Sequence, residues 1–199
     1  MRHRVVQDVS VVEAHGFGPR MTTWWGTLAF MALEGMGFVL AAGAYLYLAW
    51  LNIDWPLSAD PPGLLWSGLF TLVLLLSLIP NELVKKRSLE QNNKKTRLLL
   101  VAMCVIGVLT LGIRAFEFTS LNIRWDTNAY GSLLWVLLGL HTTHLLTDVV
   151  DTFALTALFF TRHSPVKRFS DAEDNALYWS FVVLSWVPLY LLLYWLPRL

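Results

Sequence analysis

Five long apolar stretches dominate the sequence and limit what the chain can fold into. They run over residues 24–50, 64–83, 98–118, 130–160 and 176–196. A helix needs about 20 apolar residues to cross the roughly 30 Å hydrocarbon core of a bilayer. Within that core only helices and closed barrels satisfy their backbone polar groups. The pattern therefore predicts an all-α integral membrane protein, a bundle of five transmembrane helices.

The composition agrees with a membrane protein and excludes several other classes. Hydrophobic residues make up 56% of the chain and charged residues 15%, with a mean hydropathy of +0.53, whereas soluble domains carry about 25% charged residues. The single cysteine, Cys104, lies in an apolar run, so the chain builds neither an internal disulfide nor a cysteine metal site. Residues 1–22 lack the apolar segment of a signal peptide. We expect them to form a polar N-terminal arm, followed by a transmembrane domain over residues 23–199.

Basic residues gather on alternate loops, which predicts how the spans are oriented. Twelve of the fifteen Lys and Arg residues fall in the arm, in the loop after the second span or in the loop after the fourth: Arg2, Arg4, Arg20, Lys85, Lys86, Arg87, Lys94, Lys95, Arg97, Arg162, Lys167 and Arg168. The other three are Arg114, Arg124 and Arg198. Because cytoplasmic loops are enriched in Lys and Arg, we expect a cytoplasmic N-terminus, an external C-terminus and no nucleic-acid partner.

Ionisable residues inside the spans are candidates for function, because placing them in hydrocarbon is costly. Glu34 lies about ten residues into the first span, beside Gly35 and Gly37, which allow another backbone or a lipid chain to approach closely. Three interpretations of Glu34 follow from this position. It is a protonated carboxyl bonded to a neighbouring helix, a lipid contact, or a station on a proton path.

The fourth span carries a stripe of four polar residues, His141, His144, Asp148 and Asp151, at helical spacing. His144 and Asp148 are one turn apart, so the carboxylate is expected to orient the imidazole. Two histidines with carboxylates also resemble ligands for zinc or iron. However, the spacing is not HExxH, and the other spans contain no histidine. We therefore expect an interhelical hydrogen-bond stripe, and no metal site in this chain.

Arg114 and Glu117 stand three residues apart near the end of the third span, where an i, i+3 ion pair is expected. We interpret this pair as structural. The sequence offers no glycine-rich phosphate loop, no Ser–His–Asp set and no paired catalytic carboxylates, so no catalytic residue is predicted.

Four segments, in order, resemble motifs of the cytochrome c oxidase subunit III family. Residues 128–132 (NAYGS) with 139–144 (GLHTTH) are similar to its YGS…GFHGLH signature. Residues 111–118 (LGIRAFEF) are similar to LGxxFxxxQxxEY, with Glu117 at the acidic position, and residues 178–190 are similar to YWHFVDVVW…LY. Residues 33–38 (LEGMGF) resemble SEVMFF, with Glu34 at the family's membrane glutamate. The resemblance covers residues 24–199.

The chain also departs from these motifs. Ser180 stands where the family has histidine, and Val183 where it has aspartate. The second span reads SLIPNE over residues 77–82 in place of WAHH. Arg114 stands near the family's glutamine, and Asp148 and Asp151 are additions. These departures indicate a divergent bacterial branch.

The resemblance implies a non-catalytic core subunit of a haem–copper terminal oxidase in a bacterial inner membrane, within aerobic electron transport coupled to proton translocation. Haem and copper then belong to partner subunits, with none in this chain. Subunit I is the direct packing partner, subunit II and a small subunit IV are further partners, and phospholipid is bound. The implied role is to stabilise subunit I.

Two alternatives stay open from the sequence. The first is a subunit III of a quinol oxidase, or a subunit that accompanies nitric oxide reductase. The second is a free-standing membrane transporter or intramembrane metalloenzyme that uses the stripe of His141, His144 and Asp148.

The expected orientation is testable with reporter fusions. Fusions after Asp60 and after Asn128 should report a periplasmic location and a fusion after Arg87 a cytoplasmic one, because the basic loops stay inside. An alkaline phosphatase and a fluorescent reporter at each site check this. The opposite pattern at two of the three sites would overturn the orientation.

Overall fold

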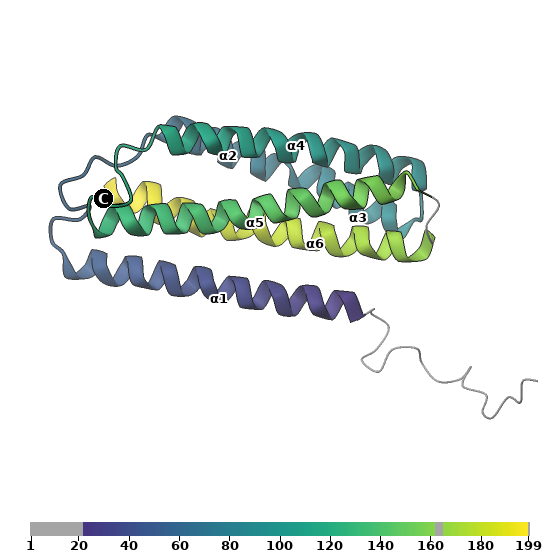
Figure 1. Cartoon of the computed structure of the whole chain (residues 1–199), viewed down its shortest axis with the longest axis horizontal. Helices are drawn as coiled ribbons and strands as arrows, with labels where there is room; N and C mark the ends of the chain where they lie inside the picture. Colours follow the sequence, from purple (N-terminus) through teal and green to yellow (C-terminus); the bar gives the residue numbers. More distant parts are fainter. Residues whose placement is uncertain (1–21, 162–164, 199) are drawn as a thin grey trace, which may run out of the picture.

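Long helices running side by side make up the structure (Figure 1). The computed structural model describes residues 22–161 and 165–198, so the expected N-terminal arm lies outside the described residues. The helices are α1 (Thr22–Leu51), α2 (Leu64–Leu76), α3 (Leu78–Leu89), α4 (Asn93–Thr119), α5 (Ala129–Phe159) and α6 (Pro165–Tyr190), followed by a π-helical turn (Leu191–Trp195) and a 3-10 turn (Leu196–Arg198). Within the described residues, five helical runs are long and apolar enough to cross a membrane. The predicted all-α bundle of five spans is confirmed.

Helices α2 and α3 together form the second span, Leu64–Leu89, which continues beyond the stretch predicted from the sequence. The helix is interrupted at Ser77 because Pro80 has no N–H to donate to the carbonyl of Leu76. The backbone stays helical across this point, since Ser77 N donates to Val73 O at 3.0 Å and Asn81 N to Ser77 O at 3.1 Å. The interruption therefore bends one membrane span without ending it.

The last span has a similar interruption near its end. Pro188 lies inside α6 and removes the hydrogen bond that its N–H would make to Leu184 O. The π-helical turn from Leu191 to Trp195 begins one turn later. This turn brings Leu193 and Tyr194 into the buried interior, so that the last span supplies core side chains beyond the end of α6.

Two asparagine side chains fix where helices begin. Asn92 Oδ1 accepts a hydrogen bond from Lys95 N at 3.2 Å at the start of α4, and Asn128 Oδ1 accepts one from Gly131 N at 2.8 Å at the start of α5. Each bond satisfies one of the backbone N–H groups that a helix start leaves unpaired. Gly131 is needed at its position because a Cβ there would collide with the backbone oxygen of Arg124.

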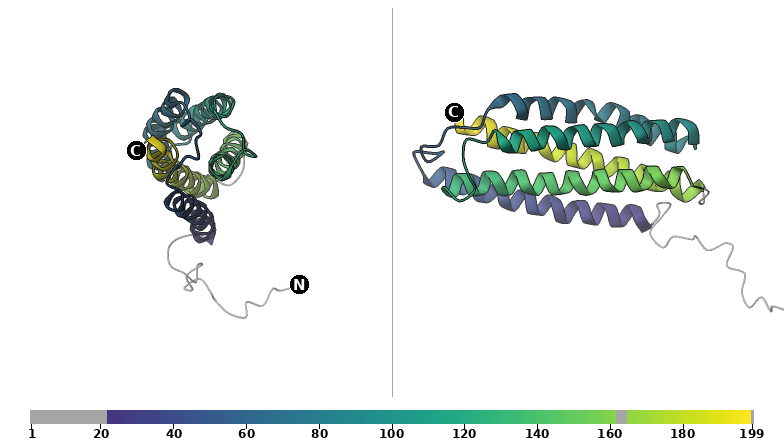
Figure 2. Two further views of the ribbon diagram at one scale, coloured as in Figure 1. Left: turned by 90° about the vertical axis from the view of Figure 1, so that its left-hand side faces the viewer. Right: turned by 45° about the horizontal axis from the view of Figure 1, so that its top comes forward.

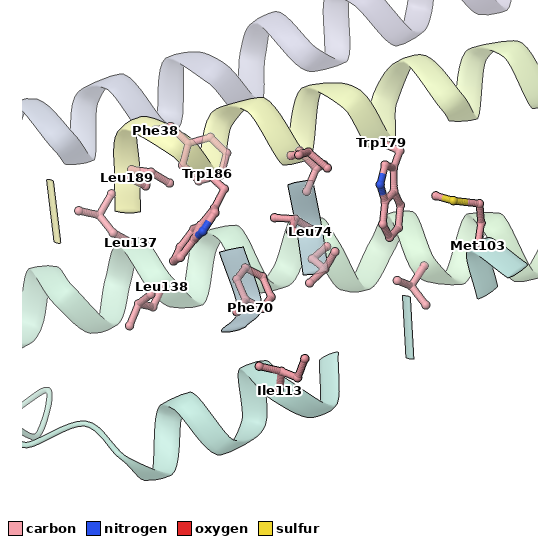
Figure 3. Packing of buried hydrophobic residues seen from close by; sticks show 14 of the residues in the cluster. Phe38, Phe70, Leu74, Met103, Ile113, Leu137, Leu138, Trp179, Trp186 and Leu189 are labelled. Atoms are coloured by element: carbon pink, nitrogen blue, oxygen red, sulfur yellow. The ribbon is translucent and has the colours of Figure 1, made fainter. Parts of the chain in front are cut away.

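Helix α1 lies at the edge of the bundle, while the other spans surround a common core (Figure 2). Helix α6 packs against α1, α2, α3 and α5. Large apolar side chains from several helices meet in the core, among them Phe70, Leu74, Trp179 and Trp186 (Figure 3). Only Phe38 and Tyr45 of α1 are buried. Most of the surface of α1 is therefore free to contact lipid or another chain.

Helices α4 and α5 approach closely at Gly107. A Cβ at that position would lie 2.7 Å from Val149 Cγ2 and 3.3 Å from its Cγ1. Valine is branched at Cβ and has little rotameric freedom in a helix, so it cannot easily move away. By contrast, a Cβ at Gly112 of the same helix would meet nothing within 4 Å.

Gly107→Ala should therefore destabilise the bundle, and Gly112→Ala should not. Both changes gain the same helix propensity, so the difference between them isolates the overpacking cost of about 1–3 kcal/mol. Thermal unfolding of the purified chain in mild detergent measures this difference. Adding Val149→Ala should recover stability in the Gly107→Ala variant, and equal melting temperatures for the two alanine variants would contradict the close approach.

Candidate functional site: two buried polar clusters

A buried cation is the centre of the first cluster, which consists of Arg114, Glu117, His141 and Tyr194. Arg114 Nη1 lies 2.7 Å from Glu117 Oε2, and each side chain is only 1% exposed. The other Glu117 oxygen accepts a hydrogen bond from the Tyr194 hydroxyl. The sequence predicted the pair, and the structure shows that it is fully enclosed and bonded to the π-helical turn that follows α6.

Aromatic rings cover the faces of the same guanidinium. Arg114 Cζ lies 3.7 Å from the ring centre of Phe70 and 4.1 Å from that of Trp186. Cation–π contacts of this kind stabilise a desolvated cation. Arg114 therefore connects α2, α4 and α6 in addition to its own ion pair.

The tautomer of His141 follows from its two partners. Arg114 Nη2 lies 3.2 Å from His141 Nδ1, and arginine can only donate, so Nδ1 accepts. The proton of the neutral ring is then on Nε2, which donates to Val182 O at 3.0 Å. Both ring nitrogens are engaged, so His141 has no lone pair left for a metal ion.

The second cluster joins three helices through Glu34 of α1, His144 of α5 and Tyr178 of α6. The Tyr178 hydroxyl donates to Glu34 Oε2 at 2.7 Å, and His144 Nε2 lies 3.1 Å from Glu34 Oε1. The side chains of Glu34 and His144 are each 10% exposed. Both oxygens of Glu34 thus have partners within the chain, as in the interpretation of a carboxyl bonded to neighbouring helices.

One proton is shared between Glu34 and His144. His144 Nδ1 lies 2.6 Å from Leu140 O and must donate to it, because a carbonyl oxygen only accepts. The proton between Nε2 and Oε1 then belongs either to an imidazolium facing a carboxylate or to a carboxyl facing a neutral ring. In both cases the pair is neutral overall, which avoids an uncompensated charge in hydrocarbon.

The expected contact between His144 and Asp148 is not formed. Because His144 Nδ1 is bonded to the preceding turn and Nε2 faces α1, neither nitrogen reaches the following turn. Asp148 Oδ1 instead accepts a hydrogen bond from Asn175 Nδ2 at 3.2 Å. The prediction that Asp148 orients His144 is wrong, although both residues make interhelical contacts.

Within residues 22–161 and 165–198, no three His, Cys, Asp or Glu side chains converge where they could hold a metal ion. The stripe in α5 is divided between different partners: His141 bonds to Arg114 and Val182, His144 to Glu34, and Asp148 to Asn175. The geometry suits hydrogen bonding between spans and does not suit cofactor binding.

Two of the departures from the family motifs contact each other. Asn81 Nδ2 donates to Ser180 Oγ at 2.9 Å and to Ala176 O at 2.8 Å. Nearby, Trp179 Nε1 donates to Ser77 Oγ at 2.8 Å. The unusual residues of the second and fifth spans therefore form a polar contact between α3 and α6.

Sequence reasoning did not single out Asn81, Asn175, Tyr178 or Tyr194 as site residues. Each is a polar side chain inside or next to an apolar run, and that was the available signal. Their partners are 23 to 144 residues away in the chain. Periodicity within one helix does not identify such partners.

Removing one partner of the buried ion pair should destabilise the folded chain far more than replacing both partners by apolar residues. Glu117→Ala leaves the Arg114 charge buried without its carboxylate and should cost about 3–5 kcal/mol, whereas Arg114→Met with Glu117→Leu should recover most of that loss. Thermal unfolding of each purified variant measures the difference. Asp126→Ala is the matched control, because its ion pair with Arg124 is exposed and worth about 0–1 kcal/mol. Equal losses for Glu117→Ala and Asp126→Ala would contradict the assigned role of the pair.

Comparison with known proteins gives one consistent result. Residues 62–198 match the family profile described as "Cytochrome c oxidase subunit III". A cytochrome c oxidase subunit 3 from Drosophila yakuba is 25% identical over 194 residues, covering 91% of this chain and 72% of its own length. The subunit 3 of Thermostichus vulcanus is 25% identical and covers 87% of both chains. That of Synechocystis is 26% identical, covering 92% of this chain and 79% of its own.

Proposed function

Because the chain belongs to the cytochrome c oxidase subunit III family, we propose that it is a non-catalytic core subunit of a haem–copper terminal oxidase in a bacterial cytoplasmic membrane. The chain is a multi-pass membrane protein with five candidate spans among its described residues. Its partners, subunits I and II, supply the haem and copper for oxygen reduction and the coupled proton translocation. This chain stabilises subunit I.

The observation that carries the non-catalytic role is that the buried polar groups bond to one another. Arg114 is occupied by Glu117 and His141, and Glu34 by Tyr178 and His144. Both nitrogens of each span histidine have partners. A catalytic or redox centre needs an open ligand position or an unengaged base, and neither cluster offers one. The metalloenzyme alternative therefore lacks support at the stripe on α5.

The edge position of α1 supports an external partner on that helix. Leu33, Met36, Val39 and Leu40 are between 61% and 71% exposed and lie on either side of the Glu34 position. A Cβ at Gly37 would meet nothing within 4 Å, so this face allows close approach from outside. We assign this face to subunit I or to phospholipid. Glu34 does not require this partner for its hydrogen bonds, and its proposed role is to hold α1 against α5 and α6.

Purification of the tagged chain in mild detergent tests the function. A larger haem-bearing partner should be purified with it, and the visible spectrum should show the haem bands of an oxidase. In Glu34→Ala, the oxidase complex should complete fewer turnovers before it loses activity, because α1 loses its bond to Tyr178. The haem content of the complex should stay the same. Leu51→Ala, at an exposed position of α1 outside the face assigned to a partner, is the control for side-chain truncation on this helix.

Two results would contradict the proposal. One is a chain that is purified without any haem protein under conditions that preserve other respiratory complexes. The other is stoichiometric metal in the isolated chain that is lost in His144→Ala.

A further inference from the structure

Asp148 is a buried acid for which the structure provides too few hydrogen-bond donors. It belongs to a candidate membrane span and is 0% exposed. Among the described residues, Asn175 Nδ2 is the donor to its Oδ1, at 3.2 Å, and no donor reaches the buried Oδ2. A buried carboxylate oxygen without a donor is unfavourable. Either a ligand or a proton must therefore satisfy Oδ2.

The amide that bonds to Asp148 is itself shared. Asn175 Nδ2 carries two N–H groups, and it also lies 3.5 Å from Asp151 Oδ2 and 3.2 Å from Thr152 Oγ1. Three acceptors thus compete for two protons. The threonine hydroxyl does not relieve this shortage, because it donates to Asn175 Oδ1 at 3.3 Å. Two carboxyl groups one turn apart on α5 therefore share one uncharged amide.

The surroundings of Asp148 do not compensate a second negative charge. Helices α1, α4 and α6 pack against α5, and α4 carries no charged residue between Arg97 and Arg114. Apart from the neutral pair of Glu34 and His144, the ionisable groups near Asp148 are acidic, namely Asp151 of α5 and, along the same cavity, Asp171 and Asp174 of α6. The two acids of α6 have interactions of their own. Because a like charge opposes the ionisation of a carboxyl, we do not expect Asp148 and Asp151 to be ionised together.

The burial of Oδ2 favours a proton over any larger ligand. This oxygen is out of reach of solvent, so a metal ion or an ammonium group cannot contact it unless the helices move apart. A proton needs no additional space. Its binding also changes what Oδ2 requires, because the hydroxyl of a protonated carboxyl donates a hydrogen bond instead of accepting one. The donor that an ionised Oδ2 would need is then no longer required.

A cavity of about 480 Å³ adjoins Asp148. It opens between the start of α1, the second half of α5 and the first turns of α6, which lie at the same end of the bundle (Figure 1). Its lining includes Asp148, Thr147, Tyr178 and the exposed Asp151. The volume accommodates several water molecules, since each takes about 30 Å³ in the liquid. Water therefore reaches the vicinity of the Asp148 carboxyl.

We propose that Asp148 is a proton-binding site, which holds a proton on Oδ2 at neutral pH and exchanges it with water in the adjoining cavity while Asp151 stays ionised. When the proton leaves to the cavity water, two carboxylates compete for the Asn175 amide, and the contact between α5 and α6 weakens. The site thus makes this contact sensitive to pH. It gives a shared role to the two acids that are additions to the family motif, and it does not depend on an oxidase partner.

Infrared spectroscopy of the purified full chain, with whatever partners it retains, tests the site. At pH 7 the parent chain should show the carbonyl band of a protonated carboxyl, and Asp148→Asn should remove it. Glu34→Gln should leave this band in place, which distinguishes it from a band of Glu34. Asp151→Asn should keep the band but shift its titration to lower pH, because the neighbouring carboxylate no longer opposes ionisation. Asp60→Asn, at an exposed acid that does not line the cavity, is the matched control and should change neither.

Unfolding by a denaturing detergent at several pH values is the second measurement. The folded chain holds one proton more than the unfolded chain, in which Asp148 ionises as an ordinary acid, so the stability that this proton provides is lost as the pH rises. From pH 5 to pH 8 the unfolding constant of the parent should increase relative to that of Asp148→Asn, by up to about tenfold per pH unit. Asparagine is a neutral side chain of the same shape as the protonated acid, so the variant should fold.

Three results would overturn the proposal. The first is an infrared spectrum in which Asp148→Asn loses no band of a protonated carboxyl. The second is an unfolding constant with the same pH dependence in the parent and in Asp148→Asn. The third is an Asp148→Asn chain that fails to fold, or that unfolds more easily at every pH, as expected if an ionised carboxylate were needed there. Because both measurements are made on the chain itself, absence of a haem partner would count against the proposed function and not against the proton-binding site.

Discussion

The buried guanidinium of Arg114 is the contact on which most of the bundle depends. Its charge lies where a single unpaired cation would be very unfavourable, yet it is satisfied by Glu117, His141 and the rings of Phe70 and Trp186. These partners come from α2, α4, α5 and α6. Fixing one cation therefore fixes the rotation of four helices at once. In lipid, where apolar packing between helices gains little from water exclusion, such polar contacts provide much of the specificity.

The second cluster, Glu34 with His144 and Tyr178, fixes the rotation of α1 at the edge of the bundle. Most of α1 is exposed, so its apolar side chains do little to determine how it is rotated against α5 and α6. Glu34 does so by meeting Tyr178 and His144 across two helix interfaces. The shared proton keeps the pair neutral, which makes a carboxyl group compatible with the hydrocarbon around it. Asn81 and Ser180 act in the same way between α3 and α6, where the amide donates to the hydroxyl.

Much of the architecture was predictable from the sequence because it depends on length and hydropathy. The five spans, the inclusion of Pro80 within one span and the i, i+3 pairing of Arg114 with Glu117 all follow from local pattern. The site was predictable only in part. His141, His144 and Asp148 were expected on one stripe, and all three are buried on α5. The stripe did not act as a unit, because His144 Nδ1 bonds back to Leu140 and turns the ring away from Asp148.

The sequence by itself determined how many helices are long and apolar enough to cross the membrane, which part of the chain forms each of them, and which polar groups would need a partner there. Those properties depend on the cost of exposing backbone and charge to hydrocarbon, which acts on each segment separately. Only the tertiary structure decided which partner each group received. Tyr178 reaches Glu34 across 144 residues of chain, and Asn175 reaches Asp148 across 27. Such pairs depend on the rotation and axial position of whole helices against each other, and these are set by side-chain packing between spans, which the periodicity of a single helix does not record.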